Sequence, residues 1–180
     1  MREQFRQYII NLYQDIPQEV YEGLLYIFCM GLVVFIAWKG LKKGLRYSAT
    51  LLLVEYIFLL FCSTVFFRTT SELRKYDFHP FWSYKAIQEG RADLLPENIM
   101  NVLVFIPVGL LLNVVPKQMT WWKAVLIGCG ISVTIETLQF FFMKGFSEVD
   151  DVVHNTLGTL IGFGILSFFR IIFKIRYKNG

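Results

Sequence analysis

Five long stretches of this chain carry almost no charge, and they constrain its fold more than any other feature. They cover about residues 20–38, 49–67, 99–115, 124–143 and 152–169. Each is close to the roughly 20 apolar residues with which an α-helix crosses a bilayer. Inside a membrane the backbone must satisfy its own hydrogen bonds, and a helix does so within one segment. The stretches therefore predict an all-α, polytopic, multi-pass membrane protein with a bundle of five transmembrane helices.

The charged residues lie mostly between these stretches and predict the orientation of the bundle. Only 18% of the 180 residues are charged, with a net charge of +4. Lysine and arginine in short loops favour the cytoplasmic side. They follow the first, third and fifth stretches, at Lys39, Lys42, Lys43, Arg46, Lys117, Lys123, Arg170, Lys174, Arg176 and Lys178. The N-terminus is thus predicted outside, the C-terminus in the cytoplasm and loop 68–97 outside. Since the positive charge reports topology, no nucleic-acid partner is predicted.

The first 19 residues have a different pattern from the rest. Apolar residues recur there at helical spacing, at Phe5, Tyr8, Ile9, Leu12, Tyr13 and Ile16. Pro17 then ends the pattern. This predicts an amphipathic helix over residues 1–19 that lies in the membrane interface, or else packs on the protein itself. Residues 20–180 are predicted to form a single membrane domain.

The cysteines predict neither a disulfide framework nor a metal site. Cys29, Cys62 and Cys129 all lie inside apolar stretches. Their number is odd and their spacing matches no ligand pattern. No metal site and no cofactor is therefore expected.

One acid interrupts the fourth apolar stretch, which contains "GISVTIETLQFFF". Glu136 lies seven residues before Met143, or about 10 Å below the outer end of the helix. A charged side chain at that depth costs about 2.5–3.5 kcal/mol, so such residues usually mark functional sites. Gln139 shares its helix face, and Ser132 lies one turn behind. The alternative is a neutral Glu136 that only hydrogen-bonds to a neighbouring helix.

The fifth stretch opens with a polar run, "FSEVDDVVHNTLG". Asp151 and Asn155 are four residues apart, as are Asp150 and His154, so they occupy two adjacent helix faces. Capping of the helix N-terminus is the alternative role for one of the aspartates. It does not explain Asn155, which lies one turn further in. A lone histidine near an interface is more often packed or solvated than a ligand.

The segment "GTLIG" that follows is a small-xxx-small pattern, which lets another helix approach closely. It fits either a contact within the chain or a homodimer.

Polar residues also interrupt the second and third stretches. Asn98 and Asn101 are three residues apart near the outer end of the third, and Arg68 ends the second at the same level. Arg68 either compensates a carboxylate or extends to the interface. Glu55 lies deeper, about two turns from the predicted cytoplasmic end. We expect one polar cleft near the outer leaflet, formed by Arg68, Asn98, Asn101, Glu136, Gln139, Asp150, Asp151, His154 and Asn155.

Three segments in order resemble the signatures of the VanZ-like family. They read "ENIMNVLVFIPVGLLL", "ISVTIETLQFFF" and "SEVDDVVHNTLGTLIG", within roughly residues 64–166. The resemblance places its characteristic residues at Asn101, Phe105, Pro107, Gly109, Glu136, Gln139, Asp151, Asn155, Thr156 and Gly158. Two departures from the family pattern concern the third segment. Its first acid is Glu148, one methylene longer, and the basic residue often found before it is missing unless Lys144 substitutes.

The resemblance implies a protein of the bacterial plasma membrane that contributes to resistance to the glycopeptide teicoplanin. It implies a context but no reaction. The first hypothesis is a factor that binds a lipid-linked cell-wall intermediate or a lipophilic glycopeptide in the outer-leaflet cleft. Membrane lipids would be its other partners.

Two alternatives assign different chemistry to the same residues. In the first, the protein is an enzyme that modifies a lipid headgroup, with Glu136 as general acid or base and Asp151 as a catalytic partner that orients a nucleophile or binds a divalent cation. In the second, which the absence of an evident repeat disfavours, it is an ion- or proton-coupled transporter that uses Glu55 and Glu136 at two depths. Whether the protein is an enzyme stays open at this stage.

Overall fold

The computed structural model describes residues 6, 10, 15–115 and 119–178. This part of the chain is mostly helical and contains one small sheet. Its elements, in chain order, are α2 (Gln18–Phe61), the π-helix η1 (Cys62–Phe66), β1 (Lys75–Asp77), α3 (Trp82–Gln88), α4 (Leu94–Val114), α5 (Trp121–Phe142), β2 (Phe146–Glu148) and α6 (Val149–Lys178). The predicted helix over residues 1–19 falls mainly outside the described residues.

Within the described residues, five helical segments are long and apolar enough to cross a membrane, which confirms the predicted fold class. They are Gln18–Leu41, Lys43–Phe66, Leu94–Val114, Trp121–Phe142 and Val149–Ile172. Each is longer than the uncharged stretch that predicted it, because polar flanking residues continue the helix. The second begins at Lys43 instead of residue 49. Glu55 therefore lies near the middle of its span, deeper than the sequence suggested.

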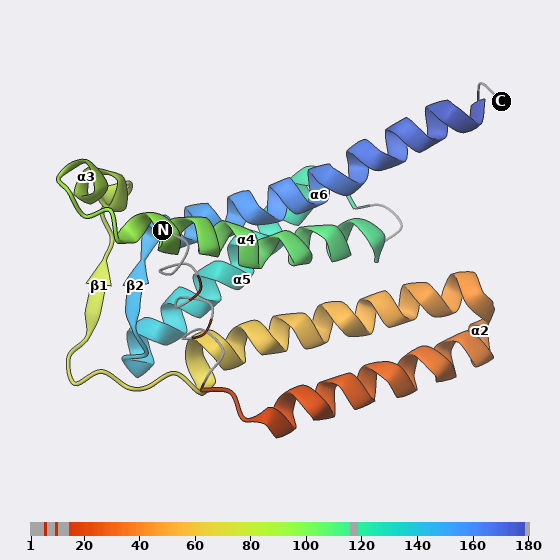
Figure 1. The fold of residues 1–180 in the computed structure, drawn as a ribbon, viewed down its shortest axis with the longest axis horizontal. Helices are drawn as coiled ribbons and strands as arrows, with labels where there is room; N and C mark the ends of the chain where they lie inside the picture. The colour runs from red at the N-terminus through yellow and green to blue at the C-terminus, as the bar shows by residue number, and fades with distance from the viewer. Residues whose placement is uncertain (1–5, 7–9, 11–14, 116–118, 179–180) are drawn as a thin grey trace.

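The first two spans form a hairpin that is continuous as a helix except at Gly40. The φ of 73° and ψ of 168° at Gly40 are non-helical and turn the chain back on itself. Glycine suits this position because a positive φ is strained for residues with a Cβ atom. Figure 1 shows the hairpin along one side of the bundle, with its first arm outermost. No residue of that first arm is buried.

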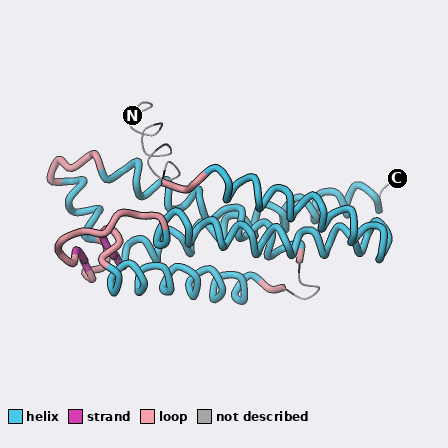
Figure 2. The backbone as a smooth tube through the Cα atoms, turned by 90° about the horizontal axis from the view of Figure 1, so that it is seen from below, coloured by secondary structure: helices cyan, strands magenta, loops and turns pink. Residues whose placement is uncertain are grey.

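The other spans enclose an apolar core. α4 and α6 lie against each other along much of their length, and α5 packs on α6 (Figures 1 and 2). The core residues come from all four packed spans: Leu53, Leu60, Val65, Phe105, Val108, Leu112, Ala124, Ile135 and Phe163. The packing of these apolar side chains fixes the helices relative to one another. It therefore also fixes the polar residues that lie nearer the sheet end.

The loop between the second and third spans is built onto the bundle. Its strand β1 pairs in parallel with β2, with Lys75 opposite Phe146 and Asp77 opposite Glu148. The loop also contains α3. The sequence did not predict this sheet, because three-residue strands leave no periodic pattern that differs from a loop.

The two ends of the bundle differ in character. The sheet and α3 lie at one end, and the Gly40 turn lies at the other with the last turn of α4 (Figure 1). Lys39, Lys43, Arg46 and Arg170 meet at that second end. The basic residues thus share one end, as the sequence suggested; the side of the membrane on which it lies stays a prediction.

Candidate functional site

A small polar cavity of about 40 Å³ lies between the spans at the sheet end of the bundle. Space of this size holds one or two water molecules or one small polar group. Six of the nine predicted site residues line it: Arg68, Asn101, Glu136, Gln139, Asp151 and Asn155. They come from α4, α5, α6 and the end of the second span, so only the tertiary fold brings them together.

Two hydrogen bonds across the cavity walls hold the third, fourth and fifth spans together. The Asn101 amide donates to Asp151 Oδ1 at 2.6 Å, which joins α4 to α6. The Asn155 amide donates to Ser132 Oγ at 2.8 Å, which joins α6 to α5. Such bonds are worth most where lipid excludes water as a competing partner.

Glu136 is buried and held by the segment that follows its own helix. The backbone N–H of Glu148 donates to Glu136 Oε2 at 2.9 Å, and the Ser147 hydroxyl donates to the backbone carbonyl of Glu136 at 3.0 Å. β2 thus fixes the position of Glu136, which belongs to the second of the three segments that resemble the family. The residue is 8% exposed, so it is largely enclosed by the protein.

Gln139 connects the cavity to the π-helix at the end of the second span. Its amide nitrogen donates to the backbone carbonyl of Thr64 at 3.1 Å. A π-helix disturbs the regular i to i−4 pattern and is frequent at functional sites. The buried Oε1 atom of Gln139 has no hydrogen-bond partner in the structure. A buried acceptor without a partner is costly, so a donor group that enters the cavity would be stabilised there.

Arg68 brings a cation to a cavity lined by three carboxylates, those of Glu97, Glu136 and Asp151. Within the described residues no salt bridge of 4 Å or less joins Arg68 to them. The guanidinium packs against Gly145, whose φ is 95° and where a Cβ atom would collide with it. Gly145 is therefore required both for its backbone angle and for this approach. The site carries more acid than base and suits a ligand with hydrogen-bond donors.

Three predicted site residues do not line the cavity. Asn98 donates to Ser83 Oγ at 3.1 Å, and His154 Nε2 pairs with the Tyr84 hydroxyl at 2.8 Å. Asp150 is 1% exposed and also contacts Ser83. All three point to α3 and fasten the loop between the second and third spans to the bundle.

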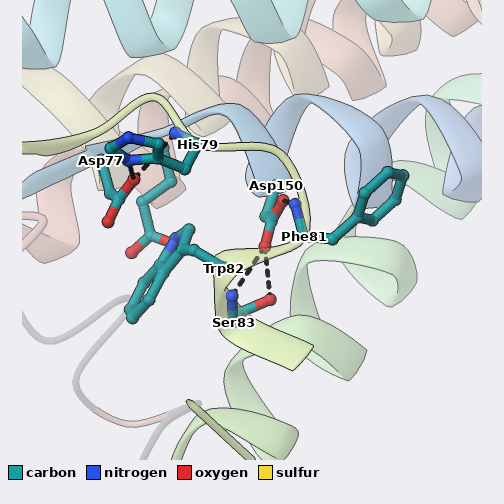
Figure 3. Close-up of polar contacts among 7 residues, drawn as sticks. Asp77, His79, Phe81, Trp82, Ser83 and Asp150 are labelled. Carbon is teal, nitrogen blue, oxygen red and sulfur yellow. Dashed lines mark hydrogen bonds and ion pairs between the residues drawn. The ribbon is translucent and has the colours of Figure 1, made fainter. Parts of the chain in front are cut away.

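Asp150 caps a helix, but a different one from its own. One carboxylate oxygen accepts the backbone N–H of Phe81, and the other accepts the backbone N–H of Ser83 at 2.9 Å and its hydroxyl at 2.6 Å (Figure 3). These are the first donors of α3, which lack partners inside the helix. The contact also holds Phe81 at φ 63°, a left-handed conformation that costs energy without glycine. The sequence analysis gave capping of the fifth helix as the alternative role for one aspartate; in the structure Asp150 caps α3.

The sequence analysis did not predict two polar residues of the cavity, Thr64 and Glu97. It also assigned no role in the site to Glu148, which lies beside the cavity. Thr64 and Glu97 line the cavity, and Glu97 lies one turn before Asn101 on α4. That i, i+4 spacing was available as a signal. Glu148 appeared only as a departure from the family pattern. Lys144, which was considered as a basic substitute, donates from Nζ to the backbone carbonyl of Arg68 at 2.7 Å and does not line the cavity.

Glu148 lies outside the spans and is buried beneath the loop that contains α3. Its Oε2 atom accepts a hydrogen bond from Trp82 Nε1 at 3.0 Å. Burial raises the pKa of Glu148 to about 8, and the carboxylates of Asp151 and Glu97 add to this shift. A proton on Glu148 reduces the negative charge around the site. Within the described residues, no group of three or more metal-binding side chains is arranged to hold an ion.

An apolar groove of about 340 Å³ lies beside the polar cavity, along α5 and α6. Its walls are mostly side chains of α5 and the first turn of α6, and Phe78 of the loop between the second and third spans also lines it. It is lined by Phe78, Val133, Thr137, Phe140, Phe141, Val149 and Val152, together with Glu136, Ser147 and Glu148. Glu136 lines both the groove and the cavity, so the two spaces meet at this acid.

Glu55 is buried but does not join this site. It is 7% exposed, and its Oε1 atom has no hydrogen-bond partner. It is not among the residues that line the cavity or the groove.

Comparisons with known proteins agree with the resemblance seen in the sequence. The model of the VanZ/LLP1 family matches residues 24–170, which is most of the chain and more than the segments first recognised. "Protein VanZ" of Enterococcus faecium is 41% identical over 66 residues, which are 37% of this chain. The match spans 41% of that relative's length. No solved structure matches. Because the family model covers most of the chain, reaches into all five spans and includes all the residues of the cavity, the chain belongs to the VanZ/LLP1 family.

Proposed function

We propose that this protein binds a lipophilic molecule of the bacterial cell envelope from the outer leaflet of the plasma membrane. The molecule is a lipid-linked cell-wall intermediate or a lipophilic glycopeptide such as teicoplanin, and its binding contributes to glycopeptide resistance. The observation that carries the proposal is the position of Glu136, which lines both an apolar groove and a small polar cavity.

The two spaces match the two parts of such a molecule. A hydrocarbon chain fits the groove, whose walls are almost entirely apolar and which opens between two spans. A small donor group, such as a hydroxyl or an amine, fits the cavity, where Gln139 Oε1 lacks a partner and carboxylates outnumber Arg68. The cavity is too small for a sugar ring, so the bulk of a headgroup would lie over the sheet and α3.

The proposal is tested by expressing the chain in a glycopeptide-susceptible bacterium. We expect it to raise the inhibitory concentration of teicoplanin but not that of a glycopeptide without a lipid chain. Glu136→Gln and Asp151→Asn should abolish the effect while protein level and membrane insertion stay normal. Full resistance in both variants would limit these acids to a structural role.

A second pair of variants tests the groove separately. Val133→Trp places a large ring in the groove and should remove the protection. Leu126→Trp is the matched control, because Leu126 lies two turns away on the same face of α5, is 62% exposed and does not line the groove. Equal loss in both variants would show that tryptophan on this face disturbs insertion and would contradict the role of the groove.

An enzyme that modifies a lipid headgroup is the second candidate, and one observation favours it. The carboxylate of Glu136 is fixed by the Glu148 N–H at the boundary between apolar and polar space, where a general acid or base for a headgroup would lie. Mass spectrometry of envelope lipids from cells with and without the protein separates the two candidates. A new or missing headgroup species favours catalysis. An unchanged lipid pool with altered glycopeptide binding favours the binding protein.

A further inference from the structure

A second concave site lies at the opposite end of the bundle and has no part in the proposed function. It is a cavity of about 660 Å³ between the hairpin α2 and the end of α6. Four cationic side chains line it: Lys39, Lys43, Arg46 and Arg170. Leu45, Tyr47 and Val114 complete its wall, and none of the described residues that line it is acidic.

No salt bridge within the described residues balances the positive charge of this site. Within the described residues the two salt bridges are His79–Asp77 and Arg91–Asp93, both in the external loop. Four cations around one concavity repel one another and create a strong local potential for an anion. Lysine and arginine residues that only determine the orientation in the membrane need not line a concave site, because water solvates each of them separately.

Arg170 is held in place by the packing of α4 against α6. Its Nη2 atom donates to the backbone carbonyl of Asn113 at 3.0 Å. The side chain of Asn113 is 4% exposed and donates to the carbonyl of Phe163 at 2.9 Å and to Ser167 Oγ at 2.8 Å. A fixed guanidinium loses less entropy when it binds, and its planar fork matches two phosphate oxygens.

We propose that this basic cavity binds the phosphate headgroup of an anionic phospholipid. It lies where the spans end, at the end of the bundle predicted to face the cytoplasm, so the lipid comes from the inner leaflet. Basic pockets between spans on that side suit such headgroups. Leu45 and Val114 offer apolar surface to the glycerol and the first methylenes, which a free phosphate would not use.

Native mass spectrometry of the purified full-length chain in mixed phosphatidylglycerol and phosphatidylcholine tests the proposal. We expect the protein to retain phosphatidylglycerol, and Lys43→Gln and Arg170→Gln each to weaken this retention about tenfold, the loss of one charge-assisted contact. Lys123→Gln is the matched control: it removes one charge at the same end, but Lys123 is exposed and does not line the cavity. It should retain the lipid as the unchanged protein does.

Three outcomes would overturn the proposal: equal retention of both lipids, equal weakening by Lys123→Gln, or displacement of the lipid by inorganic phosphate. Melting temperatures in phosphatidylcholine alone report whether each variant folds. If Arg170→Gln does not fold, Lys43→Gln still decides the question, because Lys43 is exposed. None of these variants touches the groove or the cavity at the sheet end, so failure here leaves the proposed function untouched.

Discussion

At the scale of single residues, neighbours in the sequence serve different parts of the molecule. Asp150 and Asp151 are adjacent, yet Asp150 caps α3 whereas Asp151 accepts a hydrogen bond from Asn101 in the wall of the cavity. Successive helix positions point about 100° apart, so one carboxylate faces the loop and the next faces α4. A motif that treats both as one acidic site combines a structural residue with a candidate functional one.

Glu148 is expected to make stability depend on pH. Its pKa is about 8 in the folded protein and 4.5 as an ordinary glutamate. Between these values the folded state keeps a proton that the unfolded state has released, so stability falls as pH rises through this window. The glutamine in Glu148→Gln cannot titrate, so the stability of this variant should change less with pH than that of the unchanged protein. The measurement is the apparent melting temperature in detergent across that range, followed by tryptophan fluorescence.

The control for this experiment is Glu72→Gln, which removes an exposed carboxylate from the same loop. It should leave the slope against pH unchanged. If Glu148→Gln keeps the slope of the unchanged protein, another group controls the dependence and the assignment to Glu148 is wrong.

At the scale of elements, glycines decide how closely α4 and α6 approach. A Cβ atom at Gly158 would collide with the backbone of Val102, and one at Gly162 with that of Ile106. From the other helix, a Cβ atom at Gly109 would collide with the backbone of Thr159. The small-xxx-small pattern is thus used within the chain, so a homodimer is not needed to explain it.

Gly158→Ala and Gly162→Ala should each lower the stability of the folded protein by about 1–3 kcal/mol, because the backbones must separate. Gly164→Ala in the same helix is the control, since nothing lies within 4 Å of its added methyl group. There alanine should be neutral or stabilise by up to about 1 kcal/mol through its helix propensity. Thermal unfolding in detergent measures all three, and equal losses would contradict the close-approach argument.

At the scale of the whole molecule, the bundle has a sheet end with the polar cavity and a basic end with the proposed anion site. The positive-inside pattern predicts that the basic end lies in the cytoplasm. In a chain without Cys29, Cys62 and Cys129, Thr70→Cys should react with a membrane-impermeant thiol reagent on intact cells. Thr120→Cys should react only after lysis. The opposite result would invert the bundle and move both proposed sites to the other leaflet.

The sequence by itself determined the five spans, their order and the residue types at each level. These follow from the length of apolar stretches and from the cost of charge in lipid, and both are local properties. Glu136, Gln139, Asp151 and Asn155 were identified this way. Their shared level was also predictable, because it depends only on distance along each helix.

Only the tertiary structure decided which of these side chains meet. The rotation of each helix about its axis depends on packing, such as the contact of Gly158 with Val102, and not on its own sequence. This packing turned Asp150 and His154 toward α3 and brought Glu97 into the cavity. The groove beside Glu136 and the basic cavity at the other end are shapes between elements, so no single segment of the chain encodes them.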